Sequence, residues 1–359
     1  MKIAIIGLPN SGKTTVFNAL TRGTAATMAY ASGKLEPNLA TAIVPNPCLA
    51  TLAGLYHPKK VTPADVQYVD IGGLGNGARG SDELPPALLS YLKGADALLH
   101  VVRAFEDDAV PHPAGAVDVA RDVEAVDLEL IFSDLGIIER RLERLERDIA
   151  RIATDRPQRV AERETLVRLR TALEDGSPIR DVELRDGEEP LLRGYQFLTA
   201  KPLLLVLNIG EAQLRDPPPY AYPHRHSEVV ALCANVEAEL ARMDDADARL
   251  FMDDLGISAP ARERVIAASY HLLGLISFLT VGPDEVRAWT IRRGTTAVEA
   301  GGAIHSDIQR GFIRAEVVAY EQLVQAGSMG EAKKVGVVRS EGKQYIVQDR
   351  DVCNFLFNV

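Results

Sequence analysis

The sequence has few cysteines, a single tryptophan and no long hydrophobic run. Its three cysteines, Cys48, Cys233 and Cys353, lie too far apart for a zinc site or a disulfide framework, because both need close pairs. No stretch approaches the roughly 20 apolar residues of a membrane-spanning helix, and the apolar run at residues 3–6 is too short for a signal-peptide core. We therefore expect a reduced, soluble protein of the cytoplasm that has no membrane partner.

Positive charge is also in deficit. Forty Lys and Arg against fifty Asp and Glu give a net charge of −10, so any contact with nucleic acid must come from a local basic surface, and we expect no sequence readout of DNA. Hydrophobic residues make up 47% and charged residues 25%, which is typical of folded globular chains. At roughly 150 residues per domain, the length allows two or three domains.

Short apolar runs predict the buried strands of a mostly parallel sheet. They are residues 3–6, 66–71, 97–102, 203–207 and 229–233. A helix is expected over residues 13–20, directly after the first strand. Strand, glycine-rich turn and helix in this order are typical of an α/β domain.

Between the third and fourth of these strands the apolar spacing changes to alternating threes and fours. The positions are Leu128, Ile131, Leu135, Ile138, Leu142, Leu145, Ile149 and Ile152. This spacing predicts one long helix with a coiled-coil seam. Pro157 can end it, and a second helix with Leu166, Leu169 and Leu173 can return antiparallel before Gly176. The insertion is predicted to be a helical hairpin.

Strand-like runs separated by glycines begin at about residue 276 and predict a small C-terminal α+β domain. These runs are residues 285–291, 315–319 and 344–347. The expected domains are 1–126 (first part of the α/β domain), 127–195 (helical insertion), 196–275 (second part of the α/β domain) and 276–359 (C-terminal domain).

Residues 7–14, GLPNSGKT, fit the phosphate-binding pattern G-x-x-x-x-G-K-[ST] between a predicted strand and a predicted helix. Glycines let backbone N–H groups close around phosphate oxygens, Lys13 brings a cation to the β and γ phosphates, and the Thr14 hydroxyl can ligate Mg²⁺. The alternative is a glycine-rich turn without a ligand. The predicted phosphate-binding residues are Asn10, Ser11, Gly12, Lys13, Thr14 and Thr15, with Lys13 also catalytic.

The second strand ends in DIGG at residues 70–73. There Asp70 can hold Mg²⁺, and the backbone N–H of Gly73 can reach the γ-phosphate. A strand-end Asp that caps a loop is the alternative. Because Leu74 follows Gly73, the Gln that positions the attacking water in Ras-like enzymes is missing.

The fourth strand is followed by NIGE at residues 208–211, where GTPases usually carry N-K-x-D to read guanine. Asn208 is kept, but Ile209 and Glu211 replace the Lys and the Asp. Guanine reading is therefore weakened, and adenine should be tolerated or preferred; an Asn that caps a loop by chance is the alternative. After the fifth strand, Ala234 is placed to touch the base through its backbone.

With these motifs, the chain resembles the Obg-like ATPases of the YchF type, which are P-loop NTPases of the TRAFAC class. The most specific segments are VDI at 69–71, NIGE at 208–211, EVRAWTI at 285–291, GFIRAE at 311–316 and NFLFNV at 354–359. The resemblance implies a P-loop G domain with a mostly parallel sheet, an inserted antiparallel coiled-coil hairpin and a small β-grasp-like TGS domain. It also implies that ATP is accepted as well as or better than GTP, and that the protein associates with ribosomes or RNA.

The segment FEDDAVPH at 105–112 matches the family loop whose histidine is thought to assist hydrolysis, which implies a catalytic role for His112. Without the resemblance, the position of His112 beside two prolines predicts an exposed loop residue. Two departures concern the hydrolysis rate. Lys34 stands where the family has a Thr that completes the Mg²⁺ shell, and the glycine-rich segment is altered to GSDELPP at 80–86.

The expected function is that of a Mg²⁺-dependent nucleoside triphosphatase, a monomer that acts as a nucleotide-switched regulator on ribosomes or RNA. The alternative is a nucleotide-gated binding module with negligible hydrolysis, which Lys34 and Leu74 favour. The arginine-rich hairpin could contact RNA, but its interleaved acidic residues also fit a solvated, salt-bridged face. RNA contact is therefore implied mainly by the resemblance.

Overall fold

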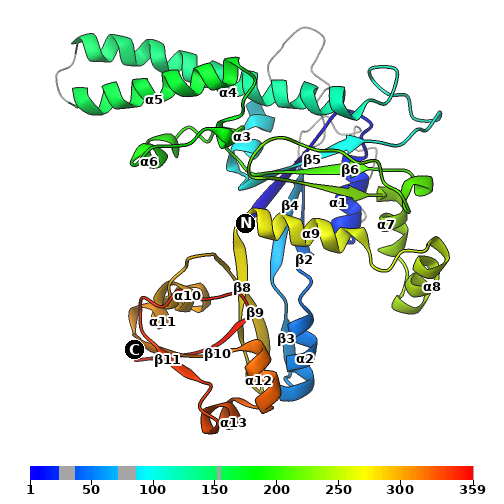
Figure 1. The fold of residues 1–359 in the computed structure, drawn as a ribbon, viewed down its shortest axis with the longest axis vertical. Coiled ribbons are helices and arrows are strands. Elements are labelled where there is room, and N and C mark those ends of the chain that lie inside the picture. Colours follow the sequence, from blue (N-terminus) through cyan, green and yellow to red (C-terminus); the bar gives the residue numbers. More distant parts are fainter. Residues whose placement is uncertain (24–36, 72–85, 152–154, 359) are drawn as a thin grey trace. The chain divides into compact units, whose positions relative to one another are not determined.

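The computed structural model describes residues 1–23, 37–71, 86–151 and 155–358 (Figure 1). The chain folds into two compact units. The first contains Met1–Ala40 and Gln67–Val265, and the second contains Thr41–Val66 and Ile266–Val359. An early segment of the chain therefore belongs to the unit that otherwise holds the C-terminal residues.

The sheet of the first unit has the strand order β2-β4-β1-β5-β6-β7. Its strands are β1 (Lys2–Ile6), β2 (Asn38–Ile43), β4 (Asp65–Asp70), β5 (Ala97–Arg103), β6 (Leu203–Asn208) and β7 (Ser227–Leu232). From β4 to β7 every neighbouring pair is parallel. Each residue of β5 and β6 is buried, as expected for parallel strands covered on both faces. The five strands predicted from apolar runs are thus confirmed, with ends shifted by one or two residues.

Helices pack on this sheet and extend from it. They are α1 (Lys13–Thr21), α3 (Pro86–Gly94), α4 (Val119–Arg151), α5 (Arg156–Glu174), α6 (Glu188–Leu192), α7 (Ala234–Leu240), α8 (Asp245–Leu255) and α9 (Ala261–Leu272), with short 3₁₀ turns η1 (Ile179–Asp181) and η2 (Glu211–Gln213). The strands β1, β4, β5 and β6 end at the same edge of the sheet, because they run parallel to one another. Residues from four separate stretches of sequence meet at this edge.

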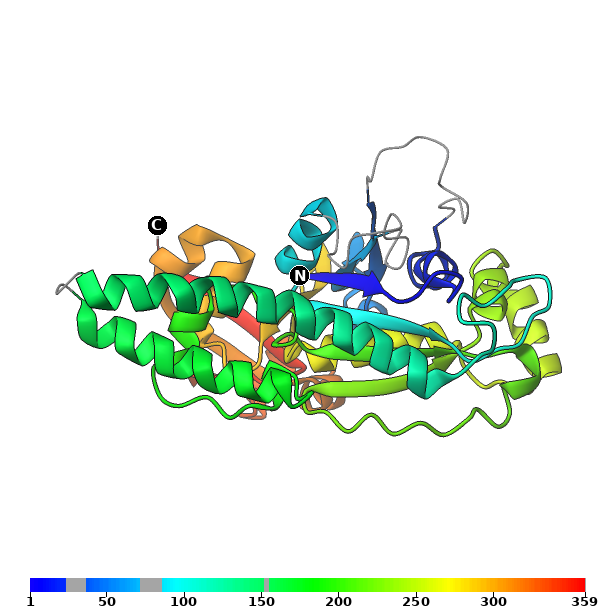
Figure 2. The same cartoon turned by 90° about the horizontal axis from the view of Figure 1, so that it is seen from above.

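The helical hairpin is confirmed: α4 and α5 lie side by side and run in opposite directions (Figure 2). Their shared core contains Ile131, Ile138, Leu142 and Leu145 from α4 and Leu166, Leu169 and Leu173 from α5. Leu128 is 40% exposed and lies outside this seam. The start of α4 belongs instead to the sheet's core, where Val123, Val126 and Leu130 are buried. One helix therefore begins on the sheet of the first unit and continues into the hairpin.

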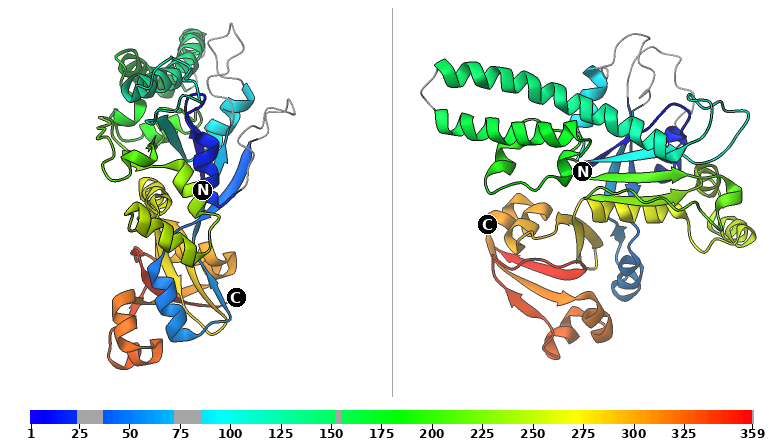
Figure 3. Two further views of the ribbon diagram at one scale, coloured as in Figure 1. Left: turned by 90° about the vertical axis from the view of Figure 1, so that its right-hand side faces the viewer. Right: turned by 45° about the horizontal axis from the view of Figure 1, so that its top comes forward.

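The second unit is built on a mixed sheet with the order β11-β10-β12-β8-β9-β3. Its elements are α2 (Pro47–Tyr56), β3 (Lys60–Thr62), β8 (Leu275–Thr280), β9 (Glu285–Arg292), α10 (Ala297–Ile304), α11 (Ser306–Arg310), β10 (Phe312–Ala319), α12 (Tyr320–Ala326), α13 (Met329–Lys334), β11 (Arg339–Glu341) and β12 (Asp351–Phe357). Helix α2, in blue, lies beside α12, in orange (Figure 3), and β3 pairs with β9.

One predicted strand of this unit is wrong. Residues 344–347 make only an isolated bridge between Ile346 and Thr296, and the strand that completes the sheet is β12, which pairs with both β10 and β8. The run at 344–347 contains the consecutive apolar residues Tyr345, Ile346 and Val347, but among the described residues it forms this single bridge and no strand. In the part of the chain that the structure describes, no helix has the length and apolarity to cross a bilayer.

Candidate functional site

The phosphate-binding loop follows β1 and ends in the first turn of α1. Three of its residues have positive φ angles: Gly7 at 144°, Asn10 at 62° and Gly12 at 92°. A Cβ on Gly12 would lie 2.2 Å from Nδ2 of Asn208, and a Cβ on Gly7 would lie 2.3 Å from the carbonyl oxygen of Val101. Both glycines are therefore required by space as well as by backbone conformation.

Lys13 is the buried cation of this loop, with only 8% of the residue exposed. Its ammonium group donates to the carbonyl oxygens of Gly7 at 2.9 Å and Leu8 at 2.7 Å. Burial lowers the pKa of Lys13 to about 8, and the nearby Asp70 opposes this shift. The ammonium group of Lys13 is thus held against the predicted phosphate-binding loop.

The two predicted metal ligands lie together. The Thr14 hydroxyl donates to Oδ2 of Asp70 at 2.8 Å. Asp70 is 1% exposed, and its Oδ1 has no hydrogen-bond partner among the residues that the structure describes. Burial raises the pKa of Asp70, although the Thr14 hydrogen bond and Lys13 favour the charged form.

This pair fits Mg²⁺, an ion that prefers oxygen ligands and is usually bound by one or two protein groups together with water and phosphate oxygens. Thr14 and Asp70 supply a hydroxyl and a carboxylate, and Oδ1 of Asp70 has no hydrogen-bond partner among the described residues. Among the described residues there is no cluster of three His, Cys, Asp or Glu that could hold a metal ion by themselves.

Asn208 connects the end of β6, where base recognition is predicted, to the phosphate loop. Its Nδ2 donates to the carbonyl oxygen of Ser11 at 2.9 Å, and its Oδ1 accepts the backbone N–H of Ala234 at 3.0 Å. Ile209 is buried and its backbone N–H bonds to Leu232, whereas Glu211 is exposed in η2. Asn208 thus joins the ends of β6 and β7 to the loop after β1.

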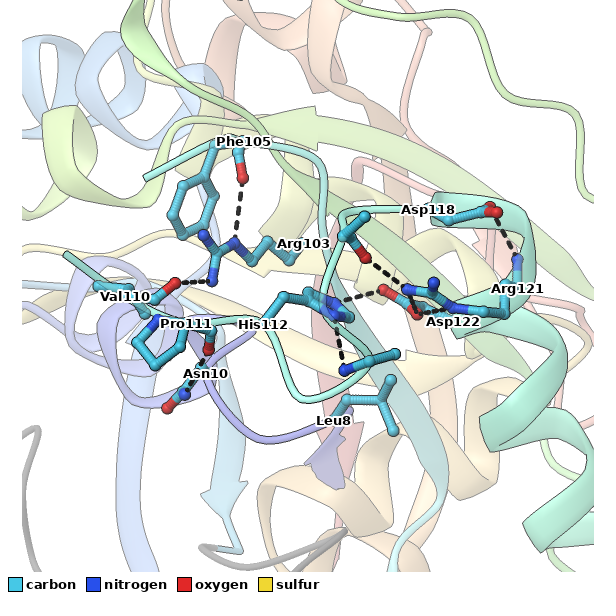
Figure 4. Close-up of polar contacts among 12 residues, drawn as sticks. Leu8, Asn10, Arg103, Phe105, Val110, Pro111, His112, Asp118, Arg121 and Asp122 are labelled. Carbon is cyan, nitrogen blue, oxygen red and sulfur yellow. Dashed lines mark hydrogen bonds and ion pairs between the residues drawn. The ribbon is translucent and has the colours of Figure 1, made fainter. Parts of the chain in front are cut away.

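The loop after β5 is fixed by buried Arg103. Its guanidinium donates to the backbone carbonyls of Phe105, Asp107 and Val110 at 2.7–3.2 Å, and it stacks over the Phe105 ring. The phosphate loop binds the same segment, because Nδ2 of Asn10 donates to the carbonyl oxygen of Pro111 at 3.0 Å (Figure 4).

His112 follows directly and is well buried. Its side chain is 4% exposed, and Nε2 lies 2.8 Å from Oδ2 of Asp122 in the first turn of α4 (Figure 4). Nδ1 accepts the backbone N–H of Ala114 at 3.1 Å. Leu8, Ser11, His112 and Asp122 line one small pocket, so the histidine lies against the phosphate loop.

The structure therefore gathers most of the predicted site at one sheet edge. Thr15 is half-buried in the first turn of α1, beside Lys13 and Thr14. Gly73 lies outside the described residues, as do Lys34, Leu74 and the segment 80–85.

The sequence analysis missed three buried polar residues near this edge: His100, Arg103 and Asp122. The first two stand in the otherwise apolar run of β5, which is a usable signal. Nothing local in the sequence marks Asp122 as the partner of a histidine ten positions earlier.

A parallel sheet with a phosphate loop between its first strand and first helix, and a Thr–Asp pair beside the buried lysine, defines a P-loop protein with a G-domain fold. In agreement, the family model described as a 50S ribosome-binding GTPase matches residues 2–133. The model of the YchF GTPase C-terminal domain, described as a protein of unknown function, matches residues 275–358.

Relatives match along the whole chain. The chain is 41% identical to "Ribosome-binding ATPase YchF" of Bacillus subtilis, over 99% of this chain and 98% of the relative. It is 38% identical to the protein of that name from Escherichia coli O157:H7, over 100% and 99%. The solved Schizosaccharomyces pombe YchF GTPase is 28% identical and superimposes with a TM-score of 0.86, over 99% and 97% of the two chains. The chain belongs to the YchF family.

Proposed function

We propose that this chain is a Mg²⁺-dependent nucleoside triphosphatase whose nucleotide state controls its association with the ribosome. The observation that carries the proposal is the contact of Thr14 with Asp70 beside the buried Lys13, because it collects a hydroxyl, a carboxylate and a cation at one phosphate loop. The names of the relatives, ribosome-binding ATPases, support the reaction and the partner. Ribosome association would place the chain in the cytoplasm, and we expect it to be a monomer.

The residues act by positioning and by charge. The amides of residues 10–15 would bind the phosphate oxygens, with Gly73 as a further donor to the γ-phosphate. Lys13 would neutralise charge on the β and γ phosphates as the transition state forms. Thr14 and Asp70 would hold Mg²⁺, which supplies further neutralisation of phosphate charge when bound.

His112 is the proposed group that positions the attacking water. Its loop is bound to the phosphate loop through Asn10, and it shares a pocket with Ser11. Both ring nitrogens have partners in this structure, so one partner must be exchanged before His112 contacts a water. This observation favours the second candidate function, a nucleotide-gated binding module with negligible hydrolysis.

Base selection should be weak. Ile209 is buried and Glu211 is exposed, so the Lys and Asp that read guanine in GTPases have no equivalents, and we expect ATP to bind at least as tightly as GTP. Asn208, Ile209, Glu211 and the backbone of Ala234 would border the base. Calorimetric titration of ATP, ADP, GTP and GDP with Mg²⁺ tests this expectation, and tenfold tighter binding of GTP would refute it.

Multiple-turnover phosphate release, with and without ribosomes, separates the two candidate functions. Lys13→Ala should abolish release in both conditions, whereas Glu189→Gln, an exposed carboxylate of α6, serves as a control for altered surface charge. Release that stays undetectable with ribosomes, while ATP still binds, would establish the binding module and refute the triphosphatase.

A further inference from the structure

The hydrogen bonds of His112 determine where its proton lies. Nδ1 accepts the backbone N–H of Ala114 at 3.1 Å, and a nitrogen that accepts a hydrogen bond carries no proton. In the neutral ring the proton is therefore on Nε2, which donates it to Oδ2 of Asp122 at 2.8 Å. This assignment follows from the hydrogen-bond partners rather than from observed hydrogens.

The second oxygen of Asp122 is occupied by a different partner. Oδ1 accepts from Nε of Arg121 at 3.0 Å and from Nη2 at 2.8 Å (Figure 4). A guanidinium group can only donate, so this side of the Asp122 side chain must always present an acceptor. The Asp122 side chain is 5% exposed, and its two oxygens are thus assigned, one to Arg121 and one to His112.

We infer that Asp122, oriented by Arg121, is a positioning residue that keeps the proton of His112 on Nε2 and makes Nδ1 its basic nitrogen. The inference rests on the proposed role of His112 in hydrolysis. Nδ1 is the nitrogen that a water can reach, because its present partner is a local and exposed N–H of Ala114, whereas Nε2 faces a buried carboxylate. The negative charge of Asp122 also stabilises the cation that forms when Nδ1 takes up a proton.

In the reaction, the oxygen of the water forms a bond to the γ-phosphorus while the bond from that phosphorus to the β–γ bridging oxygen breaks. The nucleoside diphosphate leaves with the bridging oxygen. One proton of the water moves to Nδ1 and returns later to solvent, and the other stays on the released phosphate. Asp122 takes no proton at any point. It acts only through the orientation and charge of the His112 ring.

The substitution Asp122→Asn tests this arrangement sharply. Arg121 still requires an acceptor, so it should hold the new amide oxygen and turn the amide NH₂ toward His112. Nε2 must then accept, and the proton of the ring moves to Nδ1. We expect ¹⁵N NMR of histidine-labelled protein to show this exchange, with the His112 signals assigned by comparison with His112→Gln. With ATP, Mg²⁺ and ribosomes, kcat should fall by about 10²-fold, within the range that general base catalysis contributes, while KM changes by less than about twofold.

A second substitution in the same background distinguishes positioning from a structural role. The double variant Arg121→Ala/Asp122→Asn has no guanidinium group beside residue 122, so the side-chain amide of residue 122 can turn its oxygen back to Nε2 of His112. The proton should return to Nε2, and kcat should be at least tenfold higher than in Asp122→Asn. If both residues had purely structural roles, the double variant would instead have a lower kcat than either single variant. Asp181→Asn is the matched control, because Asp181 forms another carboxylate–histidine pair in the first unit, 2.7 Å from Nδ1 of His224. It should leave kcat unchanged.

The possible failures differ in meaning. A wild-type spectrum with the proton on Nδ1, or an Asp122→Asn spectrum with the tautomer unchanged, would overturn the inference, and the wild-type measurement stands even if the variant does not fold. A tautomer that switches while kcat stays constant would instead refute the catalytic role of His112 in the proposed function.

Discussion

Replacing Asn208 with Ala should weaken the binding of ATP and GTP by the same factor. Asn208 is 4% exposed, and both of its hydrogen bonds go to buried backbone groups, the carbonyl of Ser11 and the N–H of Ala234. An unpaired buried group costs about 1–3 kcal/mol, so the loss of both partners should destabilise the first unit by roughly 2–6 kcal/mol. Because the phosphate loop loses its hydrogen bond to Asn208 at the end of β6, the affinity for the phosphates should fall whichever base the nucleotide carries.

Calorimetric titration and thermal unfolding measure the two effects. At about 2–4 °C per kcal/mol for a domain of this size, the melting temperature of the first unit should fall by roughly 4–24 °C. Asn235→Ala removes the same amide from an exposed position of α7 and should change neither quantity appreciably. A selective loss of one nucleotide, with the melting temperature unchanged, would show that Asn208 reads the base and would refute the structural argument.

Three further predictions concern stability and nucleotide binding. Burial lowers the pKa of His100 to about 3, so between pH 6.5 and 3 the unfolded chain binds a proton at this residue and the folded chain does not. The free energy of unfolding of the wild type therefore falls as the pH falls, and that of His100→Leu should fall by up to about 1.4 kcal/mol less per pH unit. Urea unfolding from pH 7 to 4.5 measures both, and an equal loss of stability in the two proteins would contradict this prediction. Burial raises the pKa of Asp134 to about 6, so between about pH 4 and 6 the folded chain binds more protons and this residue's contribution to stability falls as the pH rises. The free energy of unfolding of Asp134→Asn relative to the wild type should therefore rise by at most about 3 kcal/mol between pH 4 and 7. A relative free energy of unfolding that falls over this range would contradict the prediction. Gly12→Ala should abolish ATP binding, because the new methyl group would clash with Asn208. The control is Gly54→Ala in α2, where no atom of the described residues lies within 4 Å of the new methyl group; chemical denaturation should show it to be neutral or stabilising by up to about 1 kcal/mol.

Much of the site could be predicted because its signals are local. The spacing of Gly7, Gly12 and Lys13 predicts a phosphate loop. The positive φ angles at both glycines show why the pattern has glycine at these positions. The apolar runs predicted the strands of the parallel sheet because a strand covered on both faces has no polar side. The spacing of threes and fours predicted the hairpin for a similar reason, although Leu128, at the start of the pattern, is exposed.

The position of Asn208 shows the limit of motif reading. Its place after the fourth strand suggested base recognition, and the structure adds two backbone contacts that bind three loops together. The run at 344–347 failed for a related reason. Its composition suits a strand, but the position between β10 and β8 in this sheet is occupied by β12.

The amino-acid sequence by itself determined the phosphate loop, the strand order along the chain and the helical hairpin, because each depends on residues within about one helix or strand length of each other. Only the tertiary structure decided that residues 41–66 join the C-terminal unit and that Asp122 faces His112. Hydrogen bonds and strand pairings between distant segments depend on which surfaces the folded sheet brings into contact. That information is spread over the packing of the whole unit and leaves no local pattern in the chain.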